Sequence, residues 1–510
     1  MFLKILLVIL MLLSMALTGL LGWTLMTTNL LPRQMLLLAV GLLIILPMLL
    51  YLVQKEKKGG SKKTGTRIAV SVILLFLCIV QAAVLYFLNP YNKAMDQMTA
   101  GETQVTVIRV YVKAEDPAQT IEYAVESQYR FGTIANVDEG AVEKVRTEIE
   151  QKCGRKMIIE PYENLLELVQ ALEKGDADAL IISTAYVELM DSLEGYEDLA
   201  ESLRVLHTSS VESKLQPNKD PVEREIDPEL EEILNAPDLW EDSFCAYISG
   251  IDTFGQVSTR SRSDVNILAI VNKSTKTVLL INTPRDYYLP FNVYPAGGAL
   301  DKLTHAGVYG IDSSIQVLSD YYAIPISYYL RLNFTGFIKI IDTLGGVDVD
   351  MDTDWDNGPY HFLKGINHLD GTAALRYVRD RHSFEGGDRA RGRHQMAVIK
   401  GVIKGLASFK MLTSYSEIMD QLAECFLTNA PKKLVGELVR LTLDTSKGKW
   451  KVLTYSVDGY DRMDRSYALG FTVYVMWPAT NTVEYARSLI IDVASGNTPT
   501  QTSNTKNAPK

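Results

Sequence analysis

Three long apolar stretches near the N-terminus constrain this chain most. They run from Ile5 to Met26, from Leu36 to Val53 and from Ile68 to Leu88. Each is close to the ~20 residues with which a helix crosses the apolar core of a bilayer. A cleaved signal peptide explains the first stretch poorly, because two more stretches follow it and no small-residue cleavage site stands out. The sequence therefore predicts three membrane-spanning helices within residues 1–90.

The distribution of basic residues predicts how these helices are oriented. Residues 54–67, between the second and third stretches, carry Lys55, Lys57, Lys58, Lys62, Lys63 and Arg67. The loop between the first two stretches has only Arg33. Loops rich in lysine and arginine stay in the cytoplasm. We therefore expect a multi-pass protein of the plasma membrane whose soluble domains, from about Asn89 onward, are extracytoplasmic.

The remaining sequence divides into regions of different composition. Residues 97–208 alternate short apolar segments with charged amphipathic ones, which predicts a small α/β accessory domain. Residues 209–238 hold four prolines among many charges and are predicted to be a linker. Residues 240–493 predict a larger α/β domain with a central mixed sheet flanked by helices. The polar residues 494–510 predict a disordered tail.

Within the larger domain, the spacing of apolar residues predicts individual elements. Strands are expected at residues 244–251, 265–271, 277–283 and 328–333, with a hairpin between the second and third. Helices are expected at residues 334–344, 397–409 and 414–426. This alternation of strands and helices places the larger region in the α/β class.

Six arginines gather between residues 376 and 393, although the whole chain carries a net charge of -10. Guanidinium groups bind phosphate oxygens through paired hydrogen bonds, which predicts a phosphate-bearing ligand. An exposed basic strip, paired with the few acidic side chains nearby, is the alternative. Nucleic acid is a poor candidate for the ligand, because the chain is acidic and this region is expected outside the cytoplasm.

Local geometry predicts which of these arginines converge. Residues 377–381 are predicted to be extended, so Arg379 and Arg381 would share one face of a strand while Asp380 points away. Gly386 and Gly387 then predict a turn before a helix.

The helix after this turn presents two polar faces. Asp388 suits its N-cap, and Asp388, Arg391 and Gln395 fall on one face at helical spacing. Arg389 and Arg393 fall on another face, where we expect solvent to be their partner. Arg391 should therefore converge with the arginines of the preceding extended segment.

Three strand ends supply further polar residues. Asp252 follows the first strand, Arg262 and Asp264 open the second, and Arg285 follows the third. Ligands bind at such strand ends in α/β proteins, and Arg262 and Asp264 would point to one face. Two carboxylates together with substrate phosphate suit Mg²⁺, with Mn²⁺ as an alternative metal. Ordinary loop aspartates, and a salt bridge from Arg285 to Asp286, are the competing interpretations.

Two other features leave alternatives open. Residues 323–330 and the apolar face of the helix after them predict either a plain core or a core that admits a lipid tail; that face carries Phe334, Phe337, Ile338 and Ile341. The four cysteines have no metal-binding spacing. Either Cys245 and Cys425 form a disulfide, or the cysteines outside the membrane stretches are ordinary buried thiols.

Taken together, the motifs of the larger domain resemble those of the LytR-CpsA-Psr family of cell-envelope enzymes. The resemblance covers about residues 243–403. The motifs that carry it are Gly250-Ile251-Asp252, Arg262-Ser263-Asp264, Pro284-Arg285-Asp286, Asp301-Lys302-Leu303, Asp342 to Val347, Ala374 to Arg381, and Gly386 to Gln395. The three apolar stretches and the intervening small domain resemble the capsule-associated branch of that family.

The resemblance implies both an activity and roles for residues. Family members transfer a glycopolymer from a polyprenyl-pyrophosphate lipid to peptidoglycan, and the polyprenyl tail lies in an apolar tunnel. The resemblance implies that the pyrophosphate is held by Arg285, Arg379, Arg381 and Arg391. It also implies that Asp252 and Asp264 bind Mg²⁺, and that Arg262, Asp388 and Gln395 line the same site.

The resemblance therefore implies a membrane-anchored phosphotransferase that moves a capsular or teichoic-acid-like polymer. Phosphoryl transfer depends on positioning and charge stabilisation, so we expect no serine or cysteine nucleophile. Either Asp264 or Asp388 is expected to take the proton of the attacking hydroxyl. A lipid pyrophosphatase and a non-enzymatic membrane regulator are the alternative functions.

Overall fold

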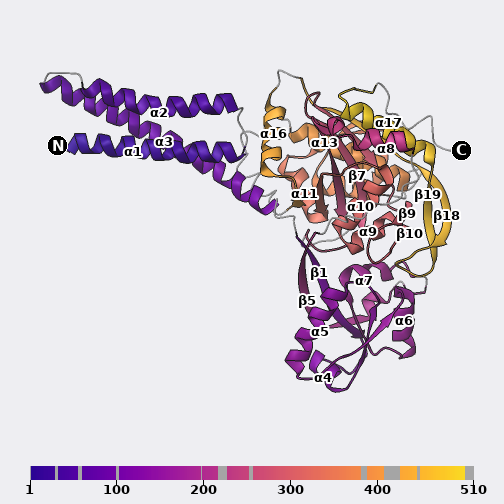
Figure 1. The fold of residues 1–510 in the computed structure, drawn as a ribbon. Helices are drawn as coiled ribbons and strands as arrows, with labels where there is room; N and C mark the ends of the chain where they lie inside the picture. Colours follow the sequence, from indigo (N-terminus) through magenta and orange to yellow (C-terminus); the bar gives the residue numbers. More distant parts are fainter. Residues whose placement is uncertain are drawn as a thin grey trace. The chain divides into compact units, whose positions relative to one another are not determined.

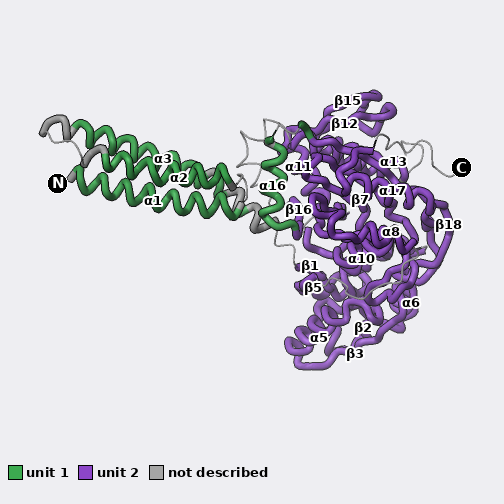
Figure 2. The backbone as a smooth tube through the Cα atoms, turned by 45° about the horizontal axis from the view of Figure 1, so that its top comes forward, with its two compact units in different colours: residues 1–99, 407–424, 430–449 green, residues 100–406, 425–429, 450–510 purple. Residues whose placement is uncertain are grey.

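The computed structural model describes residues 2–28, 33–55, 60–98, 103–193, 195–196, 198–215, 227–251, 257–380, 388–406, 425–444 and 448–499. The chain forms two compact units (Figure 2). The first holds residues 1–99, 407–424 and 430–449, and the second holds residues 100–406, 425–429 and 450–510. Figure 1 shows the helices and strands of each unit.

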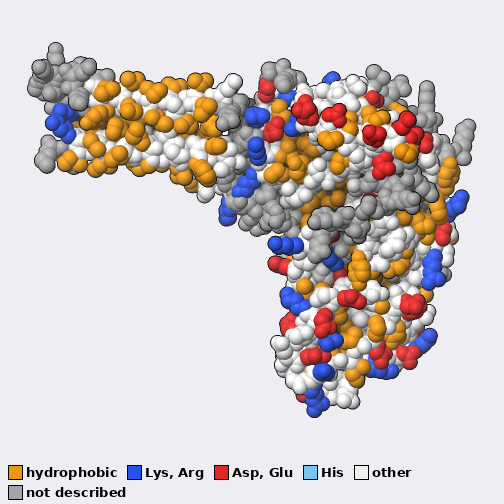
Figure 3. Space-filling view, in the orientation of Figure 1, with side chains coloured by type: hydrophobic (Ala, Val, Ile, Leu, Met, Phe, Trp, Pro, Cys, Tyr) orange, Lys and Arg blue, Asp and Glu red, His pale blue; other side chains and the backbone are white. Residues whose placement is uncertain are grey.

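Three long helices dominate the first unit: α1 (Phe2–Thr28), α2 (Arg33–Lys55) and α3 (Gly60–Met98). Each contains a stretch long and apolar enough to cross a membrane, at residues 3–27, 34–52 and 65–86. Apolar side chains cover most of the visible surface of these helices (Figure 3). A shorter helix, α16 (Lys432–Leu443), belongs to the same unit. The three predicted apolar segments are therefore helical.

A small polar cluster joins α1 to α3. The Gln81 side-chain amide donates to Thr18 Oγ1 at 2.8 Å, and Ser14 Oγ donates to Gln81 Oε1 at 3.3 Å. All three side chains are buried among apolar neighbours. Hydrogen bonds of this kind hold apolar helices together where the hydrophobic effect between them is weak, so they fix the register of α1 against α3.

The second unit contains a five-stranded sheet in the order β3-β2-β4-β1-β5. Its strands are β1 (Thr103–Lys113), β2 (Arg130–Ile134), β3 (Ile158–Tyr162), β4 (Ala179–Ser183) and β5 (Leu203–Lys214). Its helices are α4 (Ile121–Glu126), α5 (Glu139–Cys153), α6 (Leu165–Lys174) and α7 (Thr184–Met190). Local sequence explains their ends: Asn164 caps α6 by accepting from Glu167 N at 3.0 Å, and Gly175 ends it in the left-handed conformation.

Strand β5 extends into the segment that the sequence predicts to be a linker. It pairs with β1 from Thr103 opposite Lys214 to Lys113 opposite Leu203. Its residues are polar and half-exposed at the sheet edge, so they lack the apolar alternation by which strands are recognised. A short helix, α8 (Pro228–Asn235), also lies within the predicted linker, where Asp227 caps the first turn.

The larger part of the second unit is built on a six-stranded mixed sheet in the order β16-β11-β6-β7-β8-β17. The strands are β6 (Ser243–Ile251), β7 (Ser263–Asn272), β8 (Thr277–Asn282), β11 (Tyr328–Asn333), β16 (Phe426–Thr428) and β17 (Lys451–Ser456). The predicted hairpin of β7 and β8 is present, and β11 and β17 pair in parallel with β6 and β8. The predicted mixed α/β fold is therefore confirmed.

This topology brings several chain ends to one edge of the sheet. Ile251, which ends β6, lies opposite Ser263, which starts β7, and beside Asn333, which ends β11. Asn282, which ends β8, lies beside Ser456, which ends β17. Segments that leave these strands therefore start from the same edge, which is where α/β sheets bind ligands.

Helices and small hairpins surround this sheet. The helices are α9 (Leu303–Tyr309), α10 (Ile311–Tyr322), α11 (Phe334–Thr343), α12 (Gly371–Arg379), α13 (Asp388–Leu406) and α17 (Thr480–Ala494). The hairpins pair β9 (Tyr288–Phe291) with β10 (Ala299–Lys302), β12 (Val347–Met351) with β15 (Gly365–Leu369), β13 (Trp355–Asn357) with β14 (Tyr360–Phe362), and β18 (Gly459–Arg465) with β19 (Thr472–Pro478).

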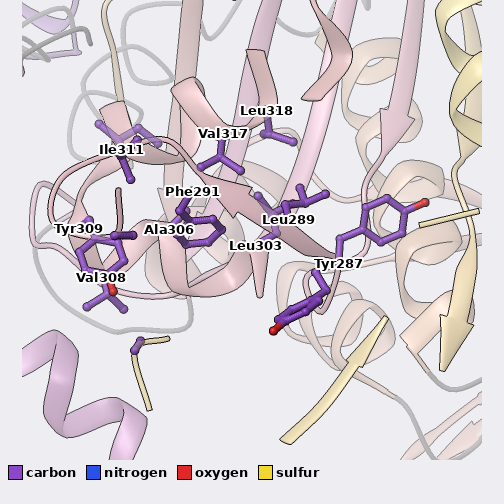
Figure 4. Close-up of a cluster of buried hydrophobic side chains, with 14 of the residues drawn as sticks. Tyr287, Leu289, Phe291, Leu303, Ala306, Val308, Tyr309, Ile311, Val317 and Leu318 are labelled. Atoms are coloured by element: carbon purple, nitrogen blue, oxygen red, sulfur yellow. The ribbon is translucent and has the colours of Figure 1, made fainter. Parts of the chain in front are cut away.

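One hydrophobic core connects both sheets of the second unit. Its buried residues include Leu168 and Tyr186 from the smaller sheet region and Tyr247, Leu279 and Leu318 from the larger one. Figure 4 shows part of this core, where side chains of β9, α9 and α10 pack together. None of the four cysteines forms a disulfide, and Cys245 and Cys425 are buried thiols.

Two local predictions need correction. Residues 377–379 are not extended, because they form the last turn of α12. Asp370 caps this helix by accepting from Ala373 N at 2.7 Å, and Ala373, Ala374, Tyr377 and Val378 form a buried face at helical spacing. Phe426 starts strand β16 rather than ending a helix, and residues 414–424 of that predicted helix lie outside the described residues.

Candidate phosphate-binding site

Asp264 lies at the centre of a charged cluster on this sheet edge. It is the second residue of β7, and Arg285, which follows β8, places its Nη1 atom 3.0 Å from each Asp264 carboxylate oxygen. The Thr304 hydroxyl donates to Asp264 Oδ1 at 3.1 Å. The backbone supports this arrangement, because Thr304 N donates to Arg285 O at 2.8 Å. The start of α9 is thus fixed against the segment that carries Arg285.

Three arginines act on the Asp264 carboxylate together. Burial alone would raise its pKa, but the charges of Arg285, Arg391 and Arg262 outweigh burial and hold the pKa well below its usual range. Asp264 is therefore ionised at any physiological pH. Arg262, Arg285 and Arg391 thus gather around Asp264. The predicted convergence of Arg391 with Arg379 and Arg381 stays a prediction, because Arg381 lies outside the described residues.

A second carboxylate neighbours the first. Asp286 Oδ1 lies 3.2 Å from Lys302 Nζ, and Asp286 Oδ2 lies 3.5 Å from Arg285 Nε. Burial opposes ionisation, but Lys302, Arg285 and Arg391 lower the pKa of Asp286. The salt bridge from Arg285 to Asp286 therefore exists alongside the one to Asp264. In the described part of the cluster, four cations (Arg262, Arg285, Lys302 and Arg391) face two carboxylates.

Helix α13 delivers Arg391 through a close approach to β8. A Cβ atom on Gly392 would lie 2.1 Å from Asn282 Nδ2, so any larger residue there would force the Asn282 side chain to move. Arg391 and Gln395 are both buried, 4% and 7% exposed. Charged side chains are rarely buried so deeply without compensating partners, and the nearby carboxylates Asp264 and Asp286 provide that compensation.

The prediction that solvent is the partner of Arg389 is wrong. Its Nε atom donates to Asp458 Oδ1 at 2.6 Å, and its Nη2 atom donates to Gly459 O at 2.7 Å and to Asp461 Oδ1 at 3.0 Å. Asp458 and Asp461 follow β17 and lie 69 and 72 residues away in the chain. Arg389 therefore ties α13 to the β18–β19 hairpin, whereas Arg393 is exposed as predicted.

Arg379 occupies a different setting from the buried cluster. It is exposed at the end of α12, and its guanidinium carbon lies 4.4 Å from the centre of the Phe334 ring. Phe334 begins α11 directly after β11, so Arg379 lies at the same sheet edge as the cluster. Its neighbour Asp380 is buried and accepts from Trp355 Nε1 at 2.8 Å and Asn357 Nδ2 at 2.7 Å.

The structure describes one further predicted site residue only in part and two not at all. Arg381 and Asp252 lie outside the described residues. Asp388 is the first residue of α13, and its side chain is not among those described, so its predicted N-cap role stays a prediction. Sequence reasoning missed the role of Thr304. The Asp301-Lys302-Leu303 motif directly before it was the signal that could have drawn attention to this segment.

The residues present fit a divalent cation only in part. Asp264 and Thr304 offer the oxygen ligands that Mg²⁺ prefers. However, Arg285 already occupies both Asp264 oxygens, and among the described residues no group of three or more His, Cys, Asp and Glu side chains is arranged around a metal position. The surrounding cations would repel a bare metal ion, so these residues suit a metal that arrives with phosphate oxygens.

Comparison with known proteins adds to this geometry. The LytR_cpsA_psr family model matches residues 205–481, more than half of the chain. The chain belongs to this family. The match includes both carboxylates and all four cations of the cluster, so the resemblance seen in the sequence motifs is confirmed.

Several LytR_cpsA_psr relatives have names that state an activity. A Bacillus cereus protein named polyisoprenyl-teichoic acid–peptidoglycan teichoic acid transferase TagU is 35% identical over 181 residues, which are 35% of this chain and 58% of the relative. The chain thus spans less than two thirds of that relative's length. A protein of the same name from Oceanobacillus iheyensis is 30% identical over 247 residues, covering 47% and 74% of the two chains. The crystal structure of B. subtilis TagV is 25% identical, covers 51% of this chain and 99% of its own, and superposes with a TM-score of 0.43.

Proposed function

We propose that the protein transfers a glycopolymer from a polyprenyl-pyrophosphate carrier to peptidoglycan. The observation that carries the proposal is the charge of the cluster. Arg262, Arg285, Lys302 and Arg391 gather around Asp264 and Asp286, so the described cluster carries an excess of positive charge that suits a pyrophosphate. Membership of the LytR_cpsA_psr family supports the same chemistry, because relatives carry names for teichoic acid transfer to peptidoglycan.

The reaction follows from where charge develops. An acceptor hydroxyl oxygen on peptidoglycan attacks the phosphorus that bears the glycan, and the bond from that phosphorus to the bridging oxygen breaks. The glycan becomes joined to peptidoglycan by a phosphodiester, and polyprenyl monophosphate leaves with the bridging oxygen. Arg262, Arg285 and Arg391 are positioned to stabilise the charge that grows on the leaving phosphate. Arg379 and Arg381 are proposed to hold the outer phosphate oxygens.

The attacking hydroxyl must lose a proton, and Asp264 is poorly suited to accept it. A general base works best when its pKa is near the working pH, whereas the three arginines hold the pKa of Asp264 far below that range. We infer that Asp264 positions Arg285 and balances the charge of the empty cluster. Asp388 remains the proposed base.

Mg²⁺ is proposed to bind together with the pyrophosphate rather than before it, with Mn²⁺ as a substitute. Asp264 and Asp252 would be its protein ligands, and its role would be to neutralise phosphate charge. Titration of Mg²⁺ into the protein should give weak binding alone and tighter binding when the lipid pyrophosphate is present. Equal affinity in both conditions would contradict this coupling.

The membrane helices fit a substrate that stays in the bilayer. We propose that α1, α2 and α3 anchor a multi-pass protein whose second unit faces the outside of the cell. The carrier's apolar tail is proposed to lie against α11, where Phe334, Phe337 and Ile338 are only half-buried. Such half-buried apolar side chains lose further water when an apolar tail covers them.

The decisive test uses the full-length protein in lipid nanodiscs with a polyprenyl-pyrophosphate oligosaccharide. Wild-type protein should transfer the sugar to added peptidoglycan, and a variant with Arg285, Arg379 and Arg381 all changed to Ala should not. Formation of polyprenyl monophosphate and oligosaccharide phosphate at the same rate without peptidoglycan would instead indicate a lipid pyrophosphatase, with water as the acceptor. No turnover under either condition would favour a non-enzymatic regulator.

A further inference from the structure

The segment that leads into the candidate site is held by the smaller sheet of the same unit. Residues 257–262 immediately precede Ser263 and Asp264 on β7. Val105, in β1, donates its N–H to Ser258 O at 3.0 Å and accepts from Arg260 N at 3.0 Å. These bonds form a parallel bridge between Val105 and Thr259. Strand β1 therefore extends its pairing onto the backbone that carries Arg262.

A buried ion pair strengthens this attachment. The Arg260 guanidinium donates to Asp138 Oδ1, and the two side chains are 16% and 6% exposed. Asp138 directly precedes helix α5 and has a φ of 51°, in the left-handed region that costs energy for a residue with a side chain. Removing one partner of such a pair leaves the other charge buried without compensation.

A third contact lies one residue closer to the site. The Ser261 hydroxyl donates to Glu188 Oε2 at 2.7 Å, and Glu188 belongs to α7. Ser261 is fully buried and is followed directly by Arg262. Ser258, Arg260 and Ser261, all within four residues of Arg262, are thus each hydrogen-bonded to an element of the smaller sheet region.

On its opposite side, the segment at residues 257–263 packs tightly against helix α9. Gly307, in α9, packs so closely that a Cβ atom there would lie 2.5 Å from Ser261 O and 2.8 Å from Ser263 N. Aromatic rings connect the two sides. The ring centroids of Tyr186, in α7, and Tyr309, in α9, are 6.5 Å apart, and those of Tyr309 and Phe291 are 6.3 Å apart. Residues 259–263 are therefore enclosed between α9 and the smaller sheet region.

We propose that the smaller sheet region, which forms the accessory domain, positions the phosphate-binding side chains of the larger domain. Asp138 and Glu188 act as positioning residues: they hold Arg260 and Ser261, and thereby set where Arg262 and Asp264 point. This inference rests on the proposed function, because it gives the accessory domain a part in binding the same pyrophosphate. Displacements of about 1 Å in such groups lower rates on the order of 100-fold.

The test compares Asp138→Asn and Glu188→Gln with a matched control. Asp178→Asn breaks a similar pair within the accessory sheet, where Arg130 Nη2 lies 2.9 Å from Asp178 Oδ1, but this pair does not touch residues 257–264. In nanodiscs, affinity for the polyprenyl-pyrophosphate oligosaccharide should fall at least about tenfold in Asp138→Asn and Glu188→Gln. It should remain unchanged in Asp178→Asn, and Asp138→Glu should recover part of the loss.

Hydrogen exchange of the Arg260 amide gives a readout that does not depend on turnover. This amide donates to Val105 O, so its exchange should speed up in Asp138→Asn while amides within α17 keep their wild-type rates. Wild-type affinity, turnover and exchange in both Asp138→Asn and Glu188→Gln would overturn the inference. If Asp138→Asn does not fold, Glu188→Gln decides by the same measurements.

Failure of the proposed function gives a different pattern. In that case the wild-type protein itself neither binds nor transfers the lipid-linked sugar, and Arg285→Ala changes nothing. Wild-type transfer that is lost in Arg285→Ala but kept in Asp138→Asn and Glu188→Gln rejects only the positioning role of the accessory sheet.

Discussion

Arg285 contacts both carboxylates of the candidate site, and its contribution depends on shape as well as charge. One nitrogen lies 3.0 Å from both Asp264 oxygens while Nε lies 3.5 Å from Asp286. Arg285→Lys keeps the charge but loses the planar fork that binds two acceptors. We expect kcat/KM for polymer transfer to fall on the order of 100-fold in Arg285→Lys and further in Arg285→Ala.

Arg376→Ala provides the control for this prediction. Arg376 belongs to the same arginine-rich stretch, but it is exposed and lies over the Tyr360 ring at 5.6 Å. Steady-state transfer rates should be unaffected by this change. A loss as large as that of Arg285→Lys would mean that total charge, rather than the cluster geometry, governs activity.

His394 is a buried histidine that should make stability fall in mild acid. Its ring stacks on the Tyr377 ring with the two centroids 4.3 Å apart, and burial lowers the pKa of His394 from 6.5 to about 4. Between these pH values, His394 is protonated in the unfolded chain but stays neutral in the folded protein. The stability contributed by neutral His394 is complete above pH 6.5 and is lost as pH falls towards 4. By pH 4.5 the loss is on the order of 2–3 kcal/mol.

His394→Gln removes this titration while keeping a polar side chain. The difference in free energy of unfolding between pH 7 and pH 4.5 should therefore be smaller in His394→Gln than in the wild type. Denaturant unfolding followed by circular dichroism at both pH values measures it. An identical pH dependence in the two proteins would show that His394 is protonated normally in the fold.

At the residue scale, the sequence predicted part of the site and missed the rest for a clear reason. Asp264, Arg262 and Arg285 lie near strand ends, and helical spacing indicated Arg391, so local pattern was sufficient for them. The partners of Arg389 lie 69 and 72 residues away on another hairpin. No local pattern contains such pairs, because they depend on how distant segments meet.

Helix α9 is the element whose packing most restricts the entry to the site. Gly307→Ala would bring a Cβ atom against backbone atoms of Ser261 and Ser263, which cannot rotate away. We expect a destabilisation of about 1–3 kcal/mol and a lower kcat/KM for transfer, because the segment bearing Arg262 must shift. Thermal unfolding and transfer assays on the same preparation measure both effects.

Gly140→Ala is the matched helical control for Gly307→Ala. Gly140 lies in α5, and nothing lies within 4 Å of a Cβ atom placed there. This substitution should leave activity unchanged and stability equal or higher, because alanine favours helix over glycine. Equal effects of both substitutions would show that α9 tolerates a methyl group against the entry segment.

Element prediction succeeded where periodicity and end signals agreed. Strand β11 matches the strand predicted at residues 328–333, and helix α6 is capped by Asn164 and Gly175, residues that favour helix ends. It failed for α12, because the prediction of an extended segment at residues 377–381 overlooked that Asp370 and the spacing of Ala373, Ala374, Tyr377 and Val378 favour a helix. Polar β5 was missed because its pairing with β1, not its composition, makes it a strand.

At the scale of the whole molecule, the orientation of the membrane helices is open to direct measurement. In a Cys153→Ala background, a cysteine introduced by Ser202→Cys should react in intact cells with a thiol reagent that cannot cross membranes. A cysteine introduced by Ser61→Cys, near the start of α3 in the basic stretch, should react only after permeabilisation. The reverse pattern would place the phosphate-binding residues inside the cell and remove the basis for peptidoglycan as acceptor.

The continuous core beneath the two sheets of the second unit limits how that unit can respond to heat or to ligand. Side chains from both sheets belong to one buried cluster, so unfolding of either sheet would expose part of this shared interior to water. Calorimetry of the second unit should accordingly record a single endotherm. Bending between the two sheets would expose these buried side chains to water. Binding of a long lipid therefore cannot depend on hinge movement there.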